Sequence, residues 1–261
     1  MGDAGIGPAA PFVFFLNPAT AGVYPSPFDL SAEFDAIHGF AAMNNSGGVA
    51  FAALDAPSTY LATLTSSGGF RVQYTGPLPR LVIADNNTFA FGTQSSIRVF
   101  PPAFFPFQTI ASIGSSFTSL GPNVGLSDAG DAVAFVADGT NGPGVFVSRR
   151  VGSTFGAPFQ IAGISGNGIL DPGETYTDAN SNGIFDAGDT DVGRFSAFDL
   201  NSTIPIDGPL GVASVRSTVA FVATDVTGKR GLYTASLDFT DAANPVIVHT
   251  LVVQIGDTII G

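Results

Sequence analysis

The amino-acid sequence predicts an all-β fold, a β-propeller-like array of about five units of about 40 residues each. Two observations predict it. Strong helix formers are scarce, since the 261 residues include 33 Gly and 18 Pro but only two Glu and one Lys. Apolar strands that end in Phe recur along the chain, and Gly, Asn, Asp and Pro separate them. The alternative is a β-sandwich whose strands look alike only because all strands favour the same residue types.

The repeat is clearest in a Val-Ala-Phe strand that follows a polar turn. It occurs at 43–53, 84–93, 126–138 and 213–225, and PFVFFLN at 11–17 is a fifth copy without the turn. Intervals of 37, 40, 44 and 86 residues separate the marker rings, which are Phe14, Phe51, Phe91, Phe135 and Phe221. Side chains alternate between the two faces of a strand, so these rings share a face with Val49, Val133 and Val219. We expect all five rings to be buried at equivalent positions.

A second strand is expected after each of the five copies, and a third strand after the four copies that have the polar turn. Second strands follow across short loops at 21–24, 59–64, 96–100, 143–148 and 230–236. Third strands are expected at 70–75, 107–112, 159–163 and 246–257. The copy at 126–148, LSDAGDAVAFVADGTNGPGVFVS, and the final turn, VVQIGDTIIG, resemble a repeat of extracellular bacterial and archaeal proteins. That resemblance implies the architecture and a surface location, without any activity.

The segment 163–193 is interpreted as a calcium-binding insertion within a single domain of residues 1–261. Its core, DANSNGIFDAGD at 178–189, has oxygen-bearing side chains at loop positions 1, 3, 5, 9 and 12 and a glycine at position 6. Calcium prefers six to eight oxygen ligands, and a loop can wrap it only if position 6 turns sharply. The expected ligands are the side chains of Asp178, Asn180, Asn182, Asp186 and Asp189 and the carbonyl of Ile184.

The residues just upstream repeat the second half of this pattern. In GNGILDPGE, Asn167, Ile169, Asp171 and Glu174 stand at positions 5, 7, 9 and 12, whereas Gly163 and Ser165 make positions 1 and 3 degenerate. The tandem pattern resembles the calcium loops of dockerins and thrombospondin type 3 repeats, which implies a second ion or extra ligands for the first. Asp189 departs from the usual glutamate at position 12. The alternative is a turn-rich surface loop without metal.

Composition excludes several classes of function. A net charge of −12 with nine Lys and Arg leaves no basic face for nucleic acid. The absence of Cys excludes disulfides and thiol chemistry, and no apolar run approaches the ~20 residues of a membrane span. His38 and His249 are the only histidines, and neither lies in a catalytic or ligand motif. Calcium loops work best at millimolar calcium, so we expect an extracellular or cell-surface location.

These observations favour a non-enzymatic structural or adhesive module that calcium stabilises. The apolar segments at 11–16 and 251–260 each lack a neighbour in the repeat, so they are expected to pair with each other in a closed ring or to exchange between molecules. Exchange would build a filament of identical subunits. The alternative is a secreted propeller enzyme or a lectin-like domain. Sequons at Asn44, Asn86 and Asn201 are compatible with glycosylation.

Overall fold

The protein is all-β. The computed structural model describes residues 12–13, 28–29, 35–65, 68–74, 79–101, 107–165, 174–179, 181, 183–184, 186, 189–201, 204, 206–207, 216–240 and 246–257. These residues form strands, turns and connections, and they include no helix. It follows that the described part of the chain has no apolar helix that could span a membrane.

Four antiparallel sheets make up the body, and each is built from strands that are neighbours in the sequence. The first sheet contains β3 (Ala36–Met43), β4 (Val49–Asp55), β5 (Ser58–Thr65) and β6 (Gly68–Tyr74). The second contains β7 (Arg80–Ile83), β8 (Phe89–Gly92), β9 (Ser96–Phe100) and β10 (Gln108–Ser112). The Val-Ala-Phe strand is the second strand in each of these sheets, as it is in the other two.

The remaining strands form two larger sheets and two small ones. The third sheet contains β11 (Phe117–Leu126), β12 (Ala132–Gly139), β13 (Gly142–Val151), β14 (Thr154–Phe155) and β15 (Phe159–Gly163). The fourth contains β18 (Phe195–Phe198), β19 (Ile206–Asp207), β20 (Arg216–Asp225), β21 (Arg230–Asp238) and β22 (Val246–Gln254). Two-stranded pairs are formed by β1 (Phe12–Val13) with β2 (Phe28–Asp29), and by β16 (Thr175–Thr177) with β17 (Thr190–Val192).

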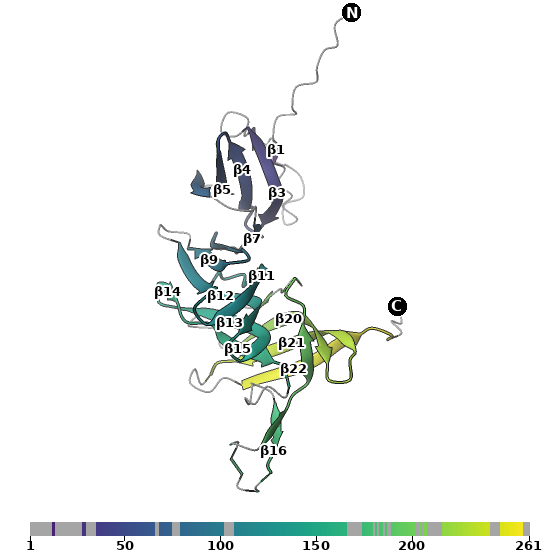
Figure 1. Cartoon of the computed structure of the whole chain (residues 1–261). Coiled ribbons are helices and arrows are strands. Elements are labelled where there is room, and N and C mark those ends of the chain that lie inside the picture. Colours follow the sequence, from purple (N-terminus) through teal and green to yellow (C-terminus); the bar gives the residue numbers. More distant parts are fainter. Residues whose placement is uncertain are drawn as a thin grey trace, which may run out of the picture.

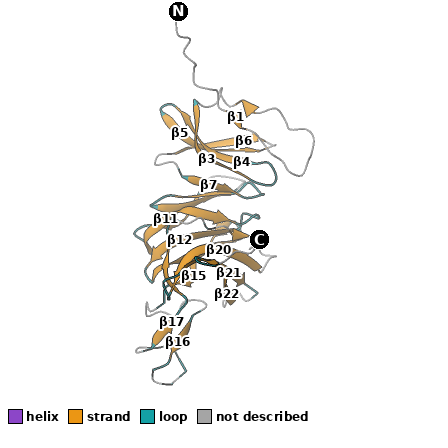
Figure 2. Ribbon diagram, turned by 90° about the vertical axis from the view of Figure 1, so that its right-hand side faces the viewer, coloured by secondary structure: helices purple, strands orange, loops and turns teal. Residues whose placement is uncertain are grey.

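The four sheets follow one another along the long axis of the molecule in sequence order (Figures 1 and 2). A separate hydrophobic cluster fills each space between consecutive sheets. The marker rings Phe51, Phe91, Phe135 and Phe221 are at most 2% exposed and lie in these clusters or in the cluster of the first sheet, which confirms that they occupy equivalent buried positions. Phe14 lies outside the described residues. Both a propeller-like array and facing sheets as in a sandwich are compatible with this stacking.

Alternate residues of the Val-Ala-Phe strand face the preceding sheet and the following sheet in turn. In β12, Val133, Phe135 and Ala137 belong to the cluster shared with the second sheet, and Ala132, Ala134 and Val136 belong to the cluster shared with the fourth. The ring therefore faces the preceding sheet and the smaller side chains face the following one. The same order holds in β4 and β8, where Ala50, Ala52 and Ala90 face the following sheet. A small residue on that side leaves room for the ring of the next sheet, because interiors are packed without voids or overlap.

The polar turns before these strands form a second link between consecutive sheets. The Asn44 side-chain amide donates to the carbonyl of Ala84 at 2.7 Å and to Oδ1 of Asn87 at 3.1 Å. One repeat later, the Asn86 amide donates to the carbonyl of Ala129 at 2.6 Å. Asparagine recurs in the motif because its amide reaches the turn of the following sheet. A glycan on Asn44 would replace these hydrogen bonds, and that side chain is only 7% exposed.

The two ends of the chain do not pair with each other in the described residues. Strand β22 pairs with β21, and β1 pairs with β2. Leu251 in β22 packs against the core between the third and fourth sheets. Closure of a ring between the segments at 11–16 and 251–260 is therefore not what the described strands show.

Candidate calcium loop

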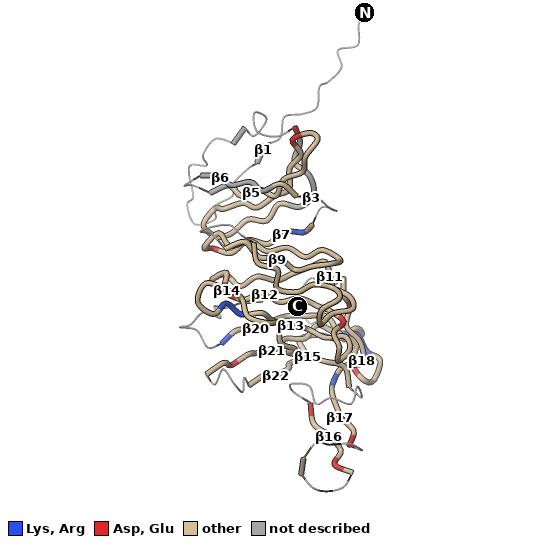
Figure 3. The backbone as a smooth tube through the Cα atoms, turned by 60° about the vertical axis from the view of Figure 1, so that its left-hand side comes forward, with Lys and Arg blue, Asp and Glu red and all other residues tan. Residues whose placement is uncertain are grey.

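The predicted calcium loop is held at the end of a β-hairpin. Strands β16 and β17 pair in antiparallel register, with Thr175 opposite Val192 and Thr177 opposite Thr190. The hairpin projects from the body beyond the third and fourth sheets, at the end away from the N-terminus (Figure 1), and several of the acidic positions lie on it (Figure 3). The sequence did not predict these two short strands. They bring residues 178 and 189, the first and last positions of the loop, to neighbouring ends of paired strands.

Hydrogen bonds within the loop fix the two terminal carboxylates. Oδ2 of Asp178 accepts a hydrogen bond from the amide of Gly183 at 2.7 Å. Asp189 accepts from the amide of Ala179 through Oδ1 at 2.8 Å and from the amide of Asp186 through Oδ2 at 3.0 Å. Gly183 has a φ of 76°, so the sixth position adopts the left-handed conformation that favours glycine. The sharp turn expected at this position is present.

These contacts turn carboxylates from both ends of the loop toward the backbone of the loop. Asp189 is bonded to the amide of Ala179, the residue after Asp178, and Asp178 is bonded to the amide of Gly183. Each carboxylate oxygen has a second lone pair, and it can accept an amide proton and coordinate a cation at the same time. A divalent ion bound by both carboxylates would offset the repulsion between their charges. The donor set therefore suits a hard cation that prefers oxygen.

The other predicted ligands are distributed as follows. Asp186 and Ile184 are exposed, and Ile184 is 66% exposed. The side chain of Ile184 has no oxygen, so only its backbone carbonyl could bind a metal. Asn180 and Asn182 of this loop lie outside the described residues, as do Asn167, Ile169 and Asp171 of the upstream loop. Within the described part of the chain, no three carboxylate or imidazole groups are close enough together to hold a metal ion.

Glu174 lies at the base of the hairpin, away from the loop end. Its carboxylate lies against Gly193, where a Cβ atom would collide with Oε1. Gly193 also donates its amide proton to Oγ of Ser165 at 2.9 Å, and Ser165 donates its amide proton to the carbonyl of Phe195 at 2.7 Å. Ser165 and Gly193 thus anchor the hairpin to the fourth sheet. In the sequence, Ser165 was notable only as a weak third position of the upstream loop.

The one histidine whose side chain is described has a packing role. Nε2 of His249 lies 2.8 Å from the carbonyl of Ile161, and the ring contacts Phe195 and Phe221 edge-on. Burial lowers the pKa of His249 below its ordinary value of 6.5, so the ring is neutral in the folded protein at neutral pH. A neutral imidazole in this position donates to a backbone carbonyl and fills the core between the third and fourth sheets.

Comparison of the chain with protein-family models gave no match, and comparison with curated proteins gave none either. The resemblance to extracellular repeat proteins and to dockerin-type loops therefore stays a prediction from the motifs alone.

Proposed function

We propose that this protein is a calcium-binding, non-enzymatic structural module that acts outside the cell. The observation that supports the proposal is that the carboxylates of Asp178 and Asp189, the first and last positions of the loop, both accept hydrogen bonds from backbone amides within the loop. The four stacked sheets would be the blades of a propeller-like array, and the hairpin would be its calcium-dependent insertion. Calcium at this loop would come from a compartment in which it is present at millimolar concentration.

The loop residues would hold the ion through oxygen atoms alone. Asp178 and Asp189 supply carboxylate oxygens, Asp186 stands at the ninth position and the Ile184 carbonyl at the seventh. Aspartate is shorter than the usual closing glutamate, so we expect weak affinity, in the range of about 10⁻⁴ to 10⁻³ M that extracellular modules show. At 1 mM calcium and a dissociation constant of about 0.1 mM, binding stabilises the folded state by about 1.4 kcal/mol.

That stabilisation would reach the body through the base of the hairpin. Strand β17 ends at Val192, and β18 begins at Phe195, a ring that is only 1% exposed and packs against Phe221 and Tyr233. An ordered hairpin therefore fixes the entry of the chain into the fourth sheet. We propose that calcium acts here as a staple, in a protein that contains no cysteine for disulfides.

Self-association is the second part of the proposal. Strand β22 pairs with β21 and lies at the edge of the fourth sheet, so a strand from a neighbouring molecule could extend the sheet there. This is the exchange that the sequence predicts, and it would build a surface filament. The alternative function, a secreted propeller enzyme or a lectin-like domain, has no observation in its favour among the described residues.

Calorimetric titration of the chelator-treated full chain tests the calcium proposal. We expect uptake of calcium in the millimolar range or below, and we expect Asp178→Asn and Asp189→Asn to abolish the uptake at this loop. Asp257→Asn is the matched control, because Asp257 is also an exposed turn aspartate that accepts a backbone amide proton, from Gln254 at 2.8 Å. Absence of uptake at 5 to 10 mM calcium, roughly tenfold above the weakest affinity expected, would refute the proposal.

A further inference from the structure

The chain has three acceptor motifs for N-glycosylation, which begin at Asn44, Asn86 and Asn201. In a folded protein such a motif is usable only where the asparagine amide and the hydroxyl two positions later can both reach the transferring enzyme. The attached sugar is bulky, so it must also extend into solvent. The fold places the three asparagines in different surroundings, and these surroundings decide between them.

The motif at Asn44 is part of the contact between the first and second sheets. Asn44 is 7% exposed, and its amide donates to the carbonyl of Ala84 at 2.7 Å and to Oδ1 of Asn87 at 3.1 Å. A side-chain amide has two protons, so a sugar on this nitrogen removes at least one of the two bonds. The sugar would also have to enter the space between the two turns. The folded protein therefore does not present this motif.

The motif at Asn86 is closed by burial of its hydroxyl residue. Thr88, two positions after Asn86, is 0% exposed. The Asn86 amide donates to the carbonyl of Ala129 at 2.6 Å, and its Oδ1 accepts from the amide of Thr88 at 2.8 Å. A Cβ atom at Gly130 would lie 2.4 Å from the same Oδ1, so the side chain is packed against the turn of the third sheet. An enzyme cannot bind the hydroxyl of this motif unless the turn unfolds.

Asn201 is exposed, and its backbone is held in place from two directions. It lies in the connection between β18 and β19. Its carbonyl accepts a hydrogen bond from Nδ2 of Asn123 in β11 at 2.5 Å, and its backbone amide donates to Oδ1 of Asp199 at 2.9 Å. Oδ2 of Asp199 pairs in turn with Arg230 of β21 at 2.6 Å. The turn is thus fixed to the third and fourth sheets by backbone groups, which leaves the Asn201 side chain at the surface.

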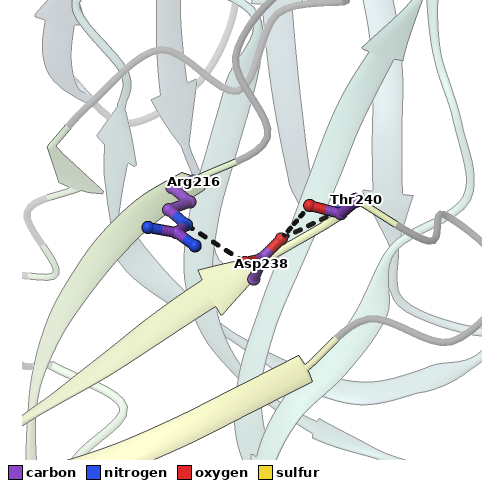
Figure 4. Close-up of polar contacts among 3 residues, drawn as sticks. All are labelled: Arg216, Asp238 and Thr240. Carbon is purple, nitrogen blue, oxygen red and sulfur yellow. Dashed lines mark hydrogen bonds and ion pairs between the residues drawn. The ribbon is translucent and has the colours of Figure 1, made fainter.

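A second turn of the fourth sheet shows what is special about Asn201. Oδ1 of Asp238 accepts from the amide of Thr240, two residues later, at 2.9 Å, and Oδ2 lies 3.0 Å from Nε of Arg216 (Figure 4). The backbone is held there as it is at Asn201. The side chain differs, because the hydroxyl of Thr240 turns back and donates to Oδ1 of Asp238 at 2.7 Å. The side-chain amide of Asn201 makes no hydrogen bond to the described part of the chain, so it is available for reaction.

We infer that burial restricts N-glycosylation of the folded protein to Asn201. The donor is an oligosaccharide on a lipid pyrophosphate carrier. Nδ2 of Asn201 forms a bond to C1 of the first sugar and gives up a proton to a base of the transferring enzyme. The bond between C1 and the phosphate oxygen breaks, and the lipid pyrophosphate leaves with that electron pair. The inference rests on the extracellular location in the proposed function and is independent of calcium.

The position of Asn201 in the fourth sheet is compatible with the rest of the proposed function. Strands β18 and β19 both pair with β20, and β22 forms the opposite edge of the sheet. A glycan in the connection between β18 and β19 is therefore attached on the side of the sheet away from β22. It leaves the edge of β22 open to the proposed strand exchange.

An in vitro transfer assay on the folded full chain tests the inference. The assay combines a single-subunit oligosaccharyltransferase that recognises Asn-x-Ser/Thr with a lipid-linked oligosaccharide, and intact mass spectrometry counts the glycans. We expect the wild-type chain to gain one glycan, mapped to Asn201 by peptide fragmentation. Asn201→Gln and Thr203→Ala should gain none, because each removes one half of the motif. Thr203→Ser is the matched control and should keep the glycan, because it retains the hydroxyl.

Synthetic peptides that cover residues 38–50, 80–92 and 195–207 test the three motifs without the fold. We expect the enzyme to modify all three peptides, which assigns the selection in the folded chain to burial. A folded wild-type chain that gains no glycan would overturn the inference, and so would a glycan at Asn44 or Asn86 of the folded chain or rejection of any of the three peptides. Calcium uptake by Thr203→Ala should match that of the wild type, so this result is separate from the calcium proposal.

Discussion

The alternation of large and small residues in the Val-Ala-Phe strand predicts how a pair of alanine substitutions should differ. Ala134 and Ala220 stand one residue before the marker ring in β12 and β20. Ala134 is fully buried against the fourth sheet, whereas Ala220 lies on the side of β20 that faces away from the third sheet and is only partly buried. Ala134→Leu adds three carbon atoms to a filled interface and should lower the free energy of unfolding by about 1 to 3 kcal/mol. Ala220→Leu meets no sheet among the described residues and should change it by less than about 0.5 kcal/mol.

Truncation of the ring on the opposite side of β12 gives the scale for this comparison. Phe135 is fully buried, and its ring centroid lies 5.7 Å from that of Phe117 and 5.9 Å from that of Phe146. Phe135→Ala should therefore cost about 3 to 5 kcal/mol. Urea denaturation followed by far-UV circular dichroism measures all three variants. Equal costs for Ala134→Leu and Ala220→Leu would refute the directional stacking of the sheets.

Three further predictions concern individual side chains. Hydrogen bonds from the hydroxyl of Thr227, the backbone amide of Lys229 and the side-chain amide of Gln254 lower the pKa of Asp225 to about 2. The stability that these bonds contribute is present above pH 3.8 and should be lost as the pH falls toward 2. Asp225→Asn should flatten that part of the profile of stability against pH. Burial lowers the pKa of His249, so the folded state binds fewer protons than the unfolded state and stability should fall as the pH drops below 6.5; a His249→Gln variant whose thermal midpoint keeps the same pH dependence between 6.5 and 5 would contradict this. Asn86→Ala removes the bond to the Ala129 carbonyl and the acceptor for the Thr88 amide, and it should cost about 1 to 3 kcal/mol in urea denaturation, against a change within about 0.5 kcal/mol for the exposed Asn141→Ala.

Much of the strand arrangement could be predicted because the motif is local. The Val-Ala-Phe strands and the strands after them were expected at positions that agree with β4, β5, β12 and β13, for example. In such strands a single window of sequence contains both the alternation and the turn that precedes it. The predicted burial of the marker rings followed from the same alternation.

The first strand of each sheet was not predicted, and the reason is physical. Strand β11 contains Gly121, Pro122 and Gly125, which are typical of a loop. In the structure, a Cβ atom at Gly121 would collide with the carbonyl of Leu200, and one at Gly125 with the carbonyl of Ile204. The glycines are required because a distant backbone segment passes close to the strand, and that contact leaves no local trace in the sequence. Strand β7 is only four residues long and carries no motif.

The candidate site divides in the same way. Its ligand spacing and the turn at Gly183 are local properties, and the spacing was sufficient to predict the turn. The hairpin that carries the loop is anchored by the hydrogen bond between Gly193 and Ser165, which are 28 positions apart in the sequence. Which face of the fourth sheet packs against the third sheet also depends on the whole stack. These features follow from tertiary contacts and could not be derived from the loop sequence.

An anomalous diffraction map from crystals grown in 5 mM calcium tests the central claim most directly. The account predicts a calcium peak about 2.3 to 2.6 Å from a carboxylate oxygen of Asp178 and from one of Asp189. A fully ordered loop with no peak between these two carboxylates at that calcium concentration would contradict it.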